Sequence, residues 1–346
     1  MSALDEWSER LRAATARLQG RGEEGAPRTI LWRDRHCVLY RYERLRPATV
    51  GPAPRTPLLI CYALVNRPTM LDLSPASSLV RRLLEGGVDV WLLDWGYPSA
   101  GDRVLELPDY IDGWLGEAVL QVWQNSGRPP AGINLLGVCQ GGTFSLCQAA
   151  LHPERIRNLI TMVTPVDFQT PDDLLSGWAR GVDVGLLATL GNVPGSLLNA
   201  IYRSLLPFRL TQQKYLSLPE LSADQEALAQ FLRMEQWIED SPDQPARAFA
   251  QFVQWFYQEN RLMHGGLDLG NARIDPTRIR CPVLNVYGSR DHLVPPAASR
   301  ALRGLTGSED YTEIELDLGH IGMYVSRRAQ EEVGPAITRW LLARDA

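Results

Sequence analysis

The sequence predicts an α/β fold built around a mainly parallel sheet, and two observations point to it. Strand-like apolar runs at 57–64, 88–93 and 158–163 alternate with helix-like segments at 75–85 and 109–123. The helix-like segment 75–85 carries its leucines on one face and is followed by two glycines, which are typical of a helix end. Alternation of this kind is typical of βαβ units, in which a helix returns the chain to a parallel neighbouring strand.

The second observation is a glycine-flanked cysteine at a junction of strand and helix. Gly137-Val138-Cys139-Gln140-Gly141 directly follows the apolar run 133–136 and precedes a helix-like segment at 143–151. This is the nucleophile-elbow pattern of the α/β-hydrolase fold, with sulfur where serine oxygen is usual. A sharp strand-to-helix turn leaves no room for β-carbons beside the nucleophile, which explains both glycines. A buried, inert cysteine is the alternative interpretation of the pentapeptide alone.

An acid and a histidine follow in the chain order that this fold requires of a catalytic triad. Asp291 comes just after the strand-like run 283–287, and His320 comes just after the strand-like run 311–316. Residues in loops after parallel strands gather at the carboxyl edge of the sheet. The sequence therefore predicts that Cys139, Asp291 and His320 form a nucleophile, acid and base.

Other residues compete for the roles of acid and base. Asp167 also follows a strand-like run and is the main rival to Asp291, which we favour because it precedes His320 late in the chain. His292 is either a second functional group or a polar neighbour of Asp291, and we favour the polar neighbour. His36 is expected in a hairpin at 29–43, His152 in a cap at the end of a helix, and His264 in a loop.

The chain between 164 and 282 contains no further strand signal. This segment is far longer than a normal crossover, which needs only a helix and two loops of about 2 to 6 residues each. We expect an inserted, largely helical cap at 168–275, placed between core segments 29–167 and 276–346. A helical segment at 1–28, with apolar residues at heptad-like spacing, is expected to precede the core. Phe249, Phe252, Val253 and Phe256 form a helical stripe at 245–260, for which core packing is favoured over a substrate channel.

Composition limits the classes of partner. With 45% hydrophobic residues, 22% charged residues and a net charge of −5, the 346-residue chain is expected to be globular and without general attraction to nucleic acid. Five cysteines without C-x-x-C spacing predict neither a metal site nor a disulfide framework, and no cofactor is expected. No segment of signal-peptide or membrane-spanning length is apparent, so we expect a cytoplasmic location with free thiols.

Four motifs together resemble polyhydroxyalkanoate synthases, most closely the catalytic subunit of the short, two-component kind. They are the Cys139 elbow, the segments 291–295 and 319–322, and Asp94-Trp95-Gly96-Tyr97-Pro98, and the resemblance runs from residue 58 to the C-terminus. It implies an α/β-hydrolase-like enzyme that polymerises (R)-3-hydroxyacyl-CoA, with 3-hydroxybutyryl-CoA as the expected substrate, into polyester and releases coenzyme A. It also implies Cys139 as nucleophile, His320 as base, Asp291 as acid and a second, non-catalytic subunit. A homo-oligomer and a place at the surface of polyester granules are further expectations.

Sulfur suits this chemistry, because acyl transfer from a coenzyme A thioester to a thiol keeps the acyl group activated. We expect His320 to deprotonate Cys139, since an unperturbed thiol is mostly protonated at neutral pH. The oxyanion is expected to bind the backbone N–H of Gln140, the residue after the nucleophile. The second donor is expected from the loop after the strand at 57–64, and Val65 is our candidate. Whether Asp291 orients His320 or activates the attacking hydroxyl itself is left open.

Two other functions are compatible with the sequence. A cysteine hydrolase of the esterase or dienelactone-hydrolase kind would use the same three residues with water as the acceptor. A non-enzymatic granule-coat or scaffold protein would keep the fold alone, although the complete triad argues against it.

Overall fold

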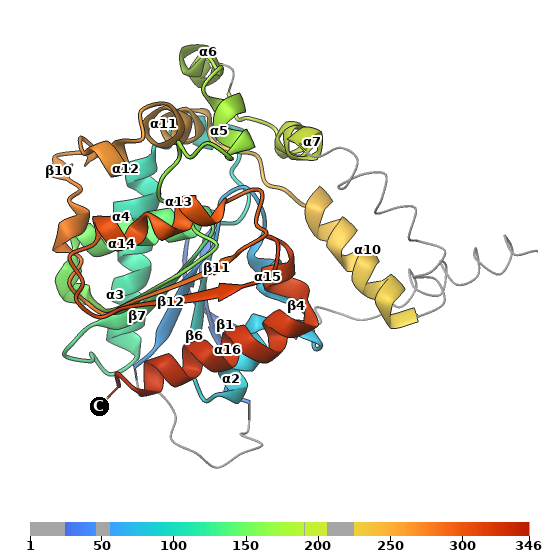
Figure 1. The fold of residues 1–346 in the computed structure, drawn as a ribbon, viewed down its shortest axis with the longest axis vertical. Helices are drawn as coiled ribbons and strands as arrows, with labels where there is room; N and C mark the ends of the chain where they lie inside the picture. Colours follow the sequence, from blue (N-terminus) through green and yellow to red (C-terminus); the bar gives the residue numbers. More distant parts are fainter. Residues whose placement is uncertain (1–24, 46–55, 190, 206–224, 346) are drawn as a thin grey trace, which may run out of the picture.

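The computed structural model describes residues 25–45, 56–189, 191–205 and 225–345. It contains an eight-stranded sheet in the order β1-β2-β6-β3-β7-β8-β11-β12 (Figure 1). The six strands from β6 to β12 in this order run parallel to one another. β2 is antiparallel to both of its neighbours, β1 and β6. The predicted α/β class and mainly parallel sheet are confirmed. The strand bounds in chain order are Arg28–Asp34 (β1), Cys37–Tyr42 (β2), Leu58–Cys61 (β3), Val90–Asp94 (β6), Ile133–Val138 (β7), Ile156–Met162 (β8), Val283–Gly288 (β11) and Tyr311–Leu316 (β12).

The central strands are buried on both faces, as a parallel sheet covered by helices requires. Every residue of β3, β6, β7 and β11 is buried. Along β3, Leu58 and Ile60 point into one hydrophobic cluster while Leu59 and Cys61 point into the other. Helices α2 (Leu79–Glu85) and α16 (Arg327–Leu342) cover the first face, and α3 (Gly116–Asn125) and α4 (Gln140–Leu151) cover the second (Figure 1).

Several helices differ from the predicted bounds. The segment 75–85 becomes helical only at Leu79, because β4 (Asp72–Ser74) and β5 (Ser77–Ser78) form a small hairpin and Ser78 caps α2. Its predicted end is confirmed, since Gly86 is the C-cap and Gly87 has φ of 80°. The segment 109–123 divides into a π-helix, η3 (Asp109–Leu115), and α3.

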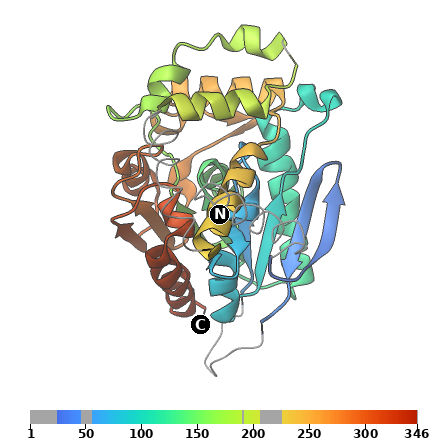
Figure 2. The same ribbon diagram turned by 90° about the vertical axis from the view of Figure 1, so that its right-hand side faces the viewer.

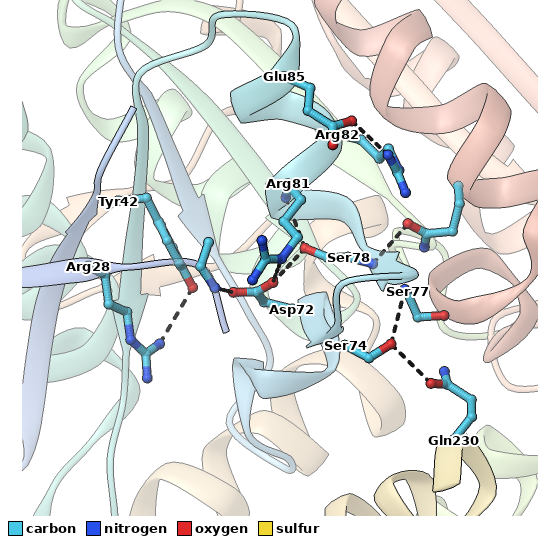
Figure 3. Close-up of polar contacts among 12 residues, drawn as sticks. Arg28, Tyr42, Asp72, Ser74, Ser77, Ser78, Arg81, Arg82, Glu85 and Gln230 are labelled. Atoms are coloured by element: carbon cyan, nitrogen blue, oxygen red, sulfur yellow. Dashed lines mark hydrogen bonds and ion pairs between the residues drawn. The ribbon is translucent and has the colours of Figure 1, made fainter. Parts of the chain in front are cut away.

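A buried carboxylate fastens the start of the chain's described part to α2 (Figure 3). Asp72 accepts hydrogen bonds from the Ala26 N–H at 2.5 Å and from Ser78 Oγ at 2.6 Å, and Arg81 lies 3.7 Å away. Burial raises the pKa of Asp72, although these partners oppose the shift. These contacts link the segment before β1 to the first turn of α2, so we assign Asp72 a structural role.

The region 164–282 adds no strand to the main sheet among its described residues. The strands described there, β9 (Asp268–Leu269) and β10 (Ala272–Arg273), pair with each other. Most helices of this region cross one end of the molecule, whereas the helix Gln225–Glu239 runs down its side (Figure 1, Figure 2). The boundaries 168–275 of the cap remain a prediction. Its helices are Leu174–Ala179 (α5), Val184–Thr189 (α6), Gly195–Leu205 (α7), Gln225–Glu239 (α10), Ala246–Phe252 (α11), the π-helix Val253–Gln258 (η6) and Arg261–His264 (α12).

At the N-terminal side, the predicted hairpin at 29–43 is confirmed as β1 and β2. Of the predicted helical segment 1–28, residues 1–24 and their heptad-like pattern lie outside the described residues, and β1 begins at Arg28. Within the described ranges, none of the helices combines the length and the apolarity needed to cross a bilayer.

Candidate active site

Cys139 occupies a strained turn between β7 and α4. Its backbone has φ of 54° and ψ of −128°, an unusual combination for a residue with a β-carbon. The turn is fixed because the Cys139 N–H donates to Met162 O at 2.9 Å and its carbonyl accepts from the Gly142 N–H at 2.8 Å. The thiol therefore stands at the carboxyl edge of the sheet, at the first turn of a helix.

The flanking glycines are required by close backbone approach. A β-carbon on Gly137 would lie 2.4 Å from Gly142 Cα, and one on Gly141 would lie 2.3 Å from Cys61 O. Both distances are far shorter than real contacts, and neither neighbour is a flexible side-chain end. The reason predicted for the two glycines is thus confirmed.

The loops after β11 and β12 bring Asp291 and His320 together. His320 Nδ1 lies 2.7 Å from Asp291 Oδ2, and both side chains are buried. The other carboxylate oxygen, Oδ1, accepts from the backbone N–H groups of Leu293 and Val294 at 2.9 Å each. The carboxylate is therefore fixed from both sides.

The rival acid has other partners. Asp167 Oδ1 accepts from the Gln169 N–H at 2.9 Å and from Asn260 Nδ2 at 2.8 Å. The carboxylate that reaches the ring of His320 is that of Asp291.

Electrostatics favour a charged imidazole at this position. Desolvation lowers the pKa of His320, but the charge of Asp291 and the hydrogen bond to it outweigh this effect. A hydrogen bond and charge interaction with Cys139 act in the same direction, and together these partners raise the pKa of His320 to about 10. Cys139 and His320 therefore interact electrostatically.

Cys139 and His320 open into a cavity of about 400 Å³ between the sheet edge and the helices of the 164–282 region. Its walls are mainly apolar, and among the described residues they include none of the other histidines. From the core side they include Ala63, Val65, Pro165, Leu293 and Val294; from the helices above, they include Leu175, Trp178, Leu198, Met234 and Trp237.

Residues of the aromatic stripe on α11 and η6 either pack in the core or line the cavity. Phe256 is fully buried in the hydrophobic core, as expected, whereas Phe249, Phe252 and Val253 line the cavity. Phe252 does both, since its ring also packs edge-on against Phe144 at 5.9 Å. Core packing was the preferred prediction for this stripe, and it is right for Phe256 but incomplete for its neighbours.

The remaining histidines lie outside the cavity. His36 is in the turn between β1 and β2, and His152 is the C-cap of α4, both as predicted. His264 was predicted in a loop, which is wrong: it ends the short helix α12.

The loop after β3 is held from two sides. The Leu64 N–H donates to Gln140 Oε1 at 2.9 Å, while Leu64 O accepts from Gln244 Nε2 at 2.8 Å. Asn66 Nδ2 donates to Ser241 Oγ at 2.8 Å, and Trp237 Nε1 donates to Arg67 O at 2.7 Å. Side chains from the segment 237–244 thus fix a loop that has no glycine of its own, and Val65 at its centre faces the cavity beside Cys139 and Gln140. No local sequence signal singles out Trp237, Ser241 or Gln244 for this task.

The chain is similar to known proteins in both sequence and fold. A family model described as the alpha/beta hydrolase fold matches residues 56–326. A poly(3-hydroxyalkanoate) polymerase subunit from Allochromatium vinosum is 52% identical over 320 residues, which cover 92% of this chain and 89% of the relative. The chain belongs to the poly(3-hydroxyalkanoate) polymerase family. A polymerase subunit from Synechocystis is 44% identical over 352 residues, covering 98% of this chain and 92% of the relative. The resemblance inferred from the four motifs is therefore confirmed.

Solved structures support the fold of this family member. A monoacylglycerol lipase from Paleococcus ferrophilus has a TM-score of 0.50 and 17% identity, covering 88% of this chain and 99% of that one. A putative non-heme bromoperoxidase from Mycobacterium tuberculosis has a TM-score of 0.52 and 12% identity, covering 88% of this chain and 100% of that one. At such identities the likeness establishes the α/β-hydrolase fold and nothing about substrate.

Proposed function

We propose that this chain is an acyltransferase that polymerises 3-hydroxyacyl-CoA into polyhydroxyalkanoate through a covalent acyl-cysteine. The observation that carries the proposal is the hydrogen-bonded Asp291–His320 pair beside a cysteine at a nucleophile elbow, all in a member of this polymerase family. The expected substrate, 3-hydroxybutyryl-CoA, remains part of the proposal.

In the first half-reaction the thiol proton resides on His320, and the Cys139 thiolate attacks the thioester carbonyl. The oxyanion is held by the backbone N–H of Gln140, at the first turn of α4, and by that of Val65. Collapse of the tetrahedral intermediate breaks the bond to the coenzyme A sulfur, which takes the proton from His320. The acyl group remains a thioester and keeps its driving force for the next transfer.

In the second half-reaction the hydroxyl of a 3-hydroxyacyl unit attacks acyl-Cys139. We propose that His320 activates this hydroxyl and that Asp291 orients the imidazole. Both oxygens of Asp291 are already occupied, one by His320 and the other by two backbone N–H groups. The described lining of the cavity includes His320, Leu293 and Val294 but not Asp291, which supports an indirect role for the carboxylate.

The apolar lining of the cavity favours transfer to an alcohol over transfer to water. A wall built largely from aliphatic and aromatic side chains offers water few partners but suits a polyester segment. A cysteine hydrolase would use the same triad, so the nature of the acceptor must be measured.

The experiment supplies 3-hydroxybutyryl-CoA and follows free thiol, polymer turbidity and soluble hydroxyacid together. Thiol release with polymer supports the proposal. Thiol release with monomeric acid identifies a hydrolase, and no thiol release identifies a scaffold. Because the relatives are named as subunits, we propose that a second, non-catalytic subunit works with the chain, so the assay is run with and without it. A homo-oligomer, a cytoplasmic location and binding at granule surfaces remain predictions.

A further inference from the structure

All side-chain hydroxyl groups in the described lining of this mainly apolar cavity belong to four tyrosines: Tyr62, Tyr202, Tyr257 and Tyr324. One of them, Tyr324, lies beside the catalytic imidazole, and Tyr62 packs against Tyr324. Tyr324 Oη is 3.3 Å from His320 Nε2, the ring nitrogen that Asp291 leaves unused. The rings of Tyr62 and Tyr324 pack edge to face with centroids 6.3 Å apart, and both side chains line the cavity.

Both phenols are held by well-packed elements. Tyr62 follows β3, and its carbonyl accepts from Trp95 Nε1 at 2.8 Å. Tyr324 belongs to α15 (Gly322–Val325), and its carbonyl accepts from Gln330 Nε2 of α16 at 2.5 Å. The next residue of this helix, Val325, accepts from Ser77 Oγ at 3.1 Å. Their positions are therefore set before a substrate arrives.

The hydroxyl groups remain neutral under working conditions. Burial raises the pKa of Tyr62 and of Tyr324 well above the ordinary tyrosine value, and the neighbouring charge of Cys139 acts in the same direction. A neutral phenol both donates and accepts a hydrogen bond. An alcohol has the same two needs.

We propose that Tyr62 and Tyr324 form a binding subsite for the secondary hydroxyl group of the unit that attacks acyl-Cys139. The inference rests on the proposed function and extends it to recognition of the acceptor. The attacking oxygen must reach His320 Nε2 and the thioester carbonyl at the same time, and Tyr324 Oη is placed within hydrogen-bonding distance of that nitrogen. In an apolar cavity an alcohol would give up its hydrogen bonds to water, and two phenols can replace them.

The step balances without further reagents. The alcohol oxygen forms a bond to the acyl carbon, its proton passes to His320 Nε2, and the bond from that carbon to Cys139 Sγ breaks. The proton on the imidazole then remains as the partner of the Cys139 thiolate. The tyrosines keep their own protons throughout.

The subsite can be separated from acylation by choosing acyl donors with and without the hydroxyl. Butyryl-CoA acylates Cys139 but has no group for the subsite, and 3-hydroxybutyryl-CoA supplies one. We expect the double variant Tyr62→Phe/Tyr324→Phe to acylate with butyryl-CoA within about twofold of the wild-type rate. Elongation with 3-hydroxybutyryl-CoA should fall at least about tenfold, the equivalent of roughly 1.4 kcal/mol.

Equal losses in both reactions would assign the tyrosines to holding His320, and unchanged elongation would assign them to packing; either result overturns the subsite. Tyr110→Phe is the matched control. Tyr110 is also a fully buried tyrosine, it lies outside the cavity, and its hydroxyl has no hydrogen-bond partner among the described residues. It should change neither rate. A wild-type chain that forms no acyl-cysteine with either donor would overturn the proposed function itself, and the subsite with it. Tm values of all variants show whether the fold is retained.

Discussion

Asp291 Oδ2 lies 2.7 Å from His320 Nδ1, and the other oxygen of the same carboxylate accepts two backbone N–H groups. Exchange of this residue tests the orienting role directly. In Asp291→Asn the negative charge that raises the pKa of His320 is lost, and the amide can present an N–H to Nδ1 and favour the wrong tautomer. We expect kcat to fall by about 10²–10⁴.

Asp167→Asn is the control for this exchange, because Asp167 also follows a strand but hydrogen-bonds to Gln169 and Asn260. Its kcat should stay within about threefold of the wild type. Comparable losses in the two variants would contradict the assignment of Asp291.

The pH dependence of stability follows from the raised pKa of His320. The imidazole has a pKa of about 10 in the folded chain against an ordinary value of 6.5, so folding favours its protonated form. This contribution is complete below pH 6.5 and is lost as the pH rises toward 10.

Thermal melts of the wild type and His320→Gln between pH 6 and 10 measure this contribution. The Tm of the wild type should fall more steeply with pH, with each kcal/mol lost worth roughly 2–4 °C. Parallel curves would show that the imidazole is not stabilised in its charged form.

The elbow glycines predict a sharp contrast between two alanine substitutions. In Gly141→Ala the new β-carbon would lie 2.3 Å from Cys61 O, so the elbow must shift or the fold must weaken. We expect loss of nearly all activity and a clearly lower Tm. Gly304→Ala is the control, because Gly304 is exposed in α14 (Leu302–Leu305) and a β-carbon there would meet no described atom within 4 Å beyond its own helical turn. It should keep activity and gain up to about 1 kcal/mol of stability.

The loop around Val65 predicts a role for a residue far away in sequence. Gln244 Nε2 donates to Leu64 O at 2.8 Å and so helps to place the proposed second oxyanion donor. In Gln244→Leu we expect kcat to fall about tenfold or more while KM stays within about twofold, because a misplaced donor weakens the transition state more than the ground state.

Gln251→Leu is the matched control. Gln251 Oε1 accepts from the Leu107 N–H at 2.7 Å and so also fixes a loop, at a place away from the elbow. Steady-state kinetics should show no change in kcat for this variant. A rise in KM alone in Gln244→Leu would indicate a part in substrate binding and not in oxyanion stabilisation.

The parallel sheet and the grouping of the site residues could be predicted because each follows from a local sequence pattern. The alternation of strands and helices predicts the parallel sheet, and the elbow glycines mark a turn where backbone atoms approach closely. Chain order then placed Asp291 and His320 at the same sheet edge as Cys139. Their catalytic roles remain predictions until measured.

The rest depends on contacts between distant segments, which no local pattern announces. Tyr62 and Tyr324 are separated by most of the chain, and nothing in the sequence near either residue indicates that their rings pack together or that Tyr324 reaches His320. Gln244 and Trp237 hold the Val65 loop only because the helices above fold back over the sheet. The late start of α2 has a similar cause, since Asp72 and Ser78 are used in a buried network that competes with helix formation.

The central claim is that Cys139 carries the acyl group, and peptide mass spectrometry after brief mixing with 3-hydroxybutyryl-CoA tests it most directly. We predict a hydroxybutyryl adduct, or its oligomers, on the peptide that contains Cys139, and none in Cys139→Ala. Coenzyme A release and polymer formation with that peptide unmodified, or with the adduct on another residue, would contradict the account.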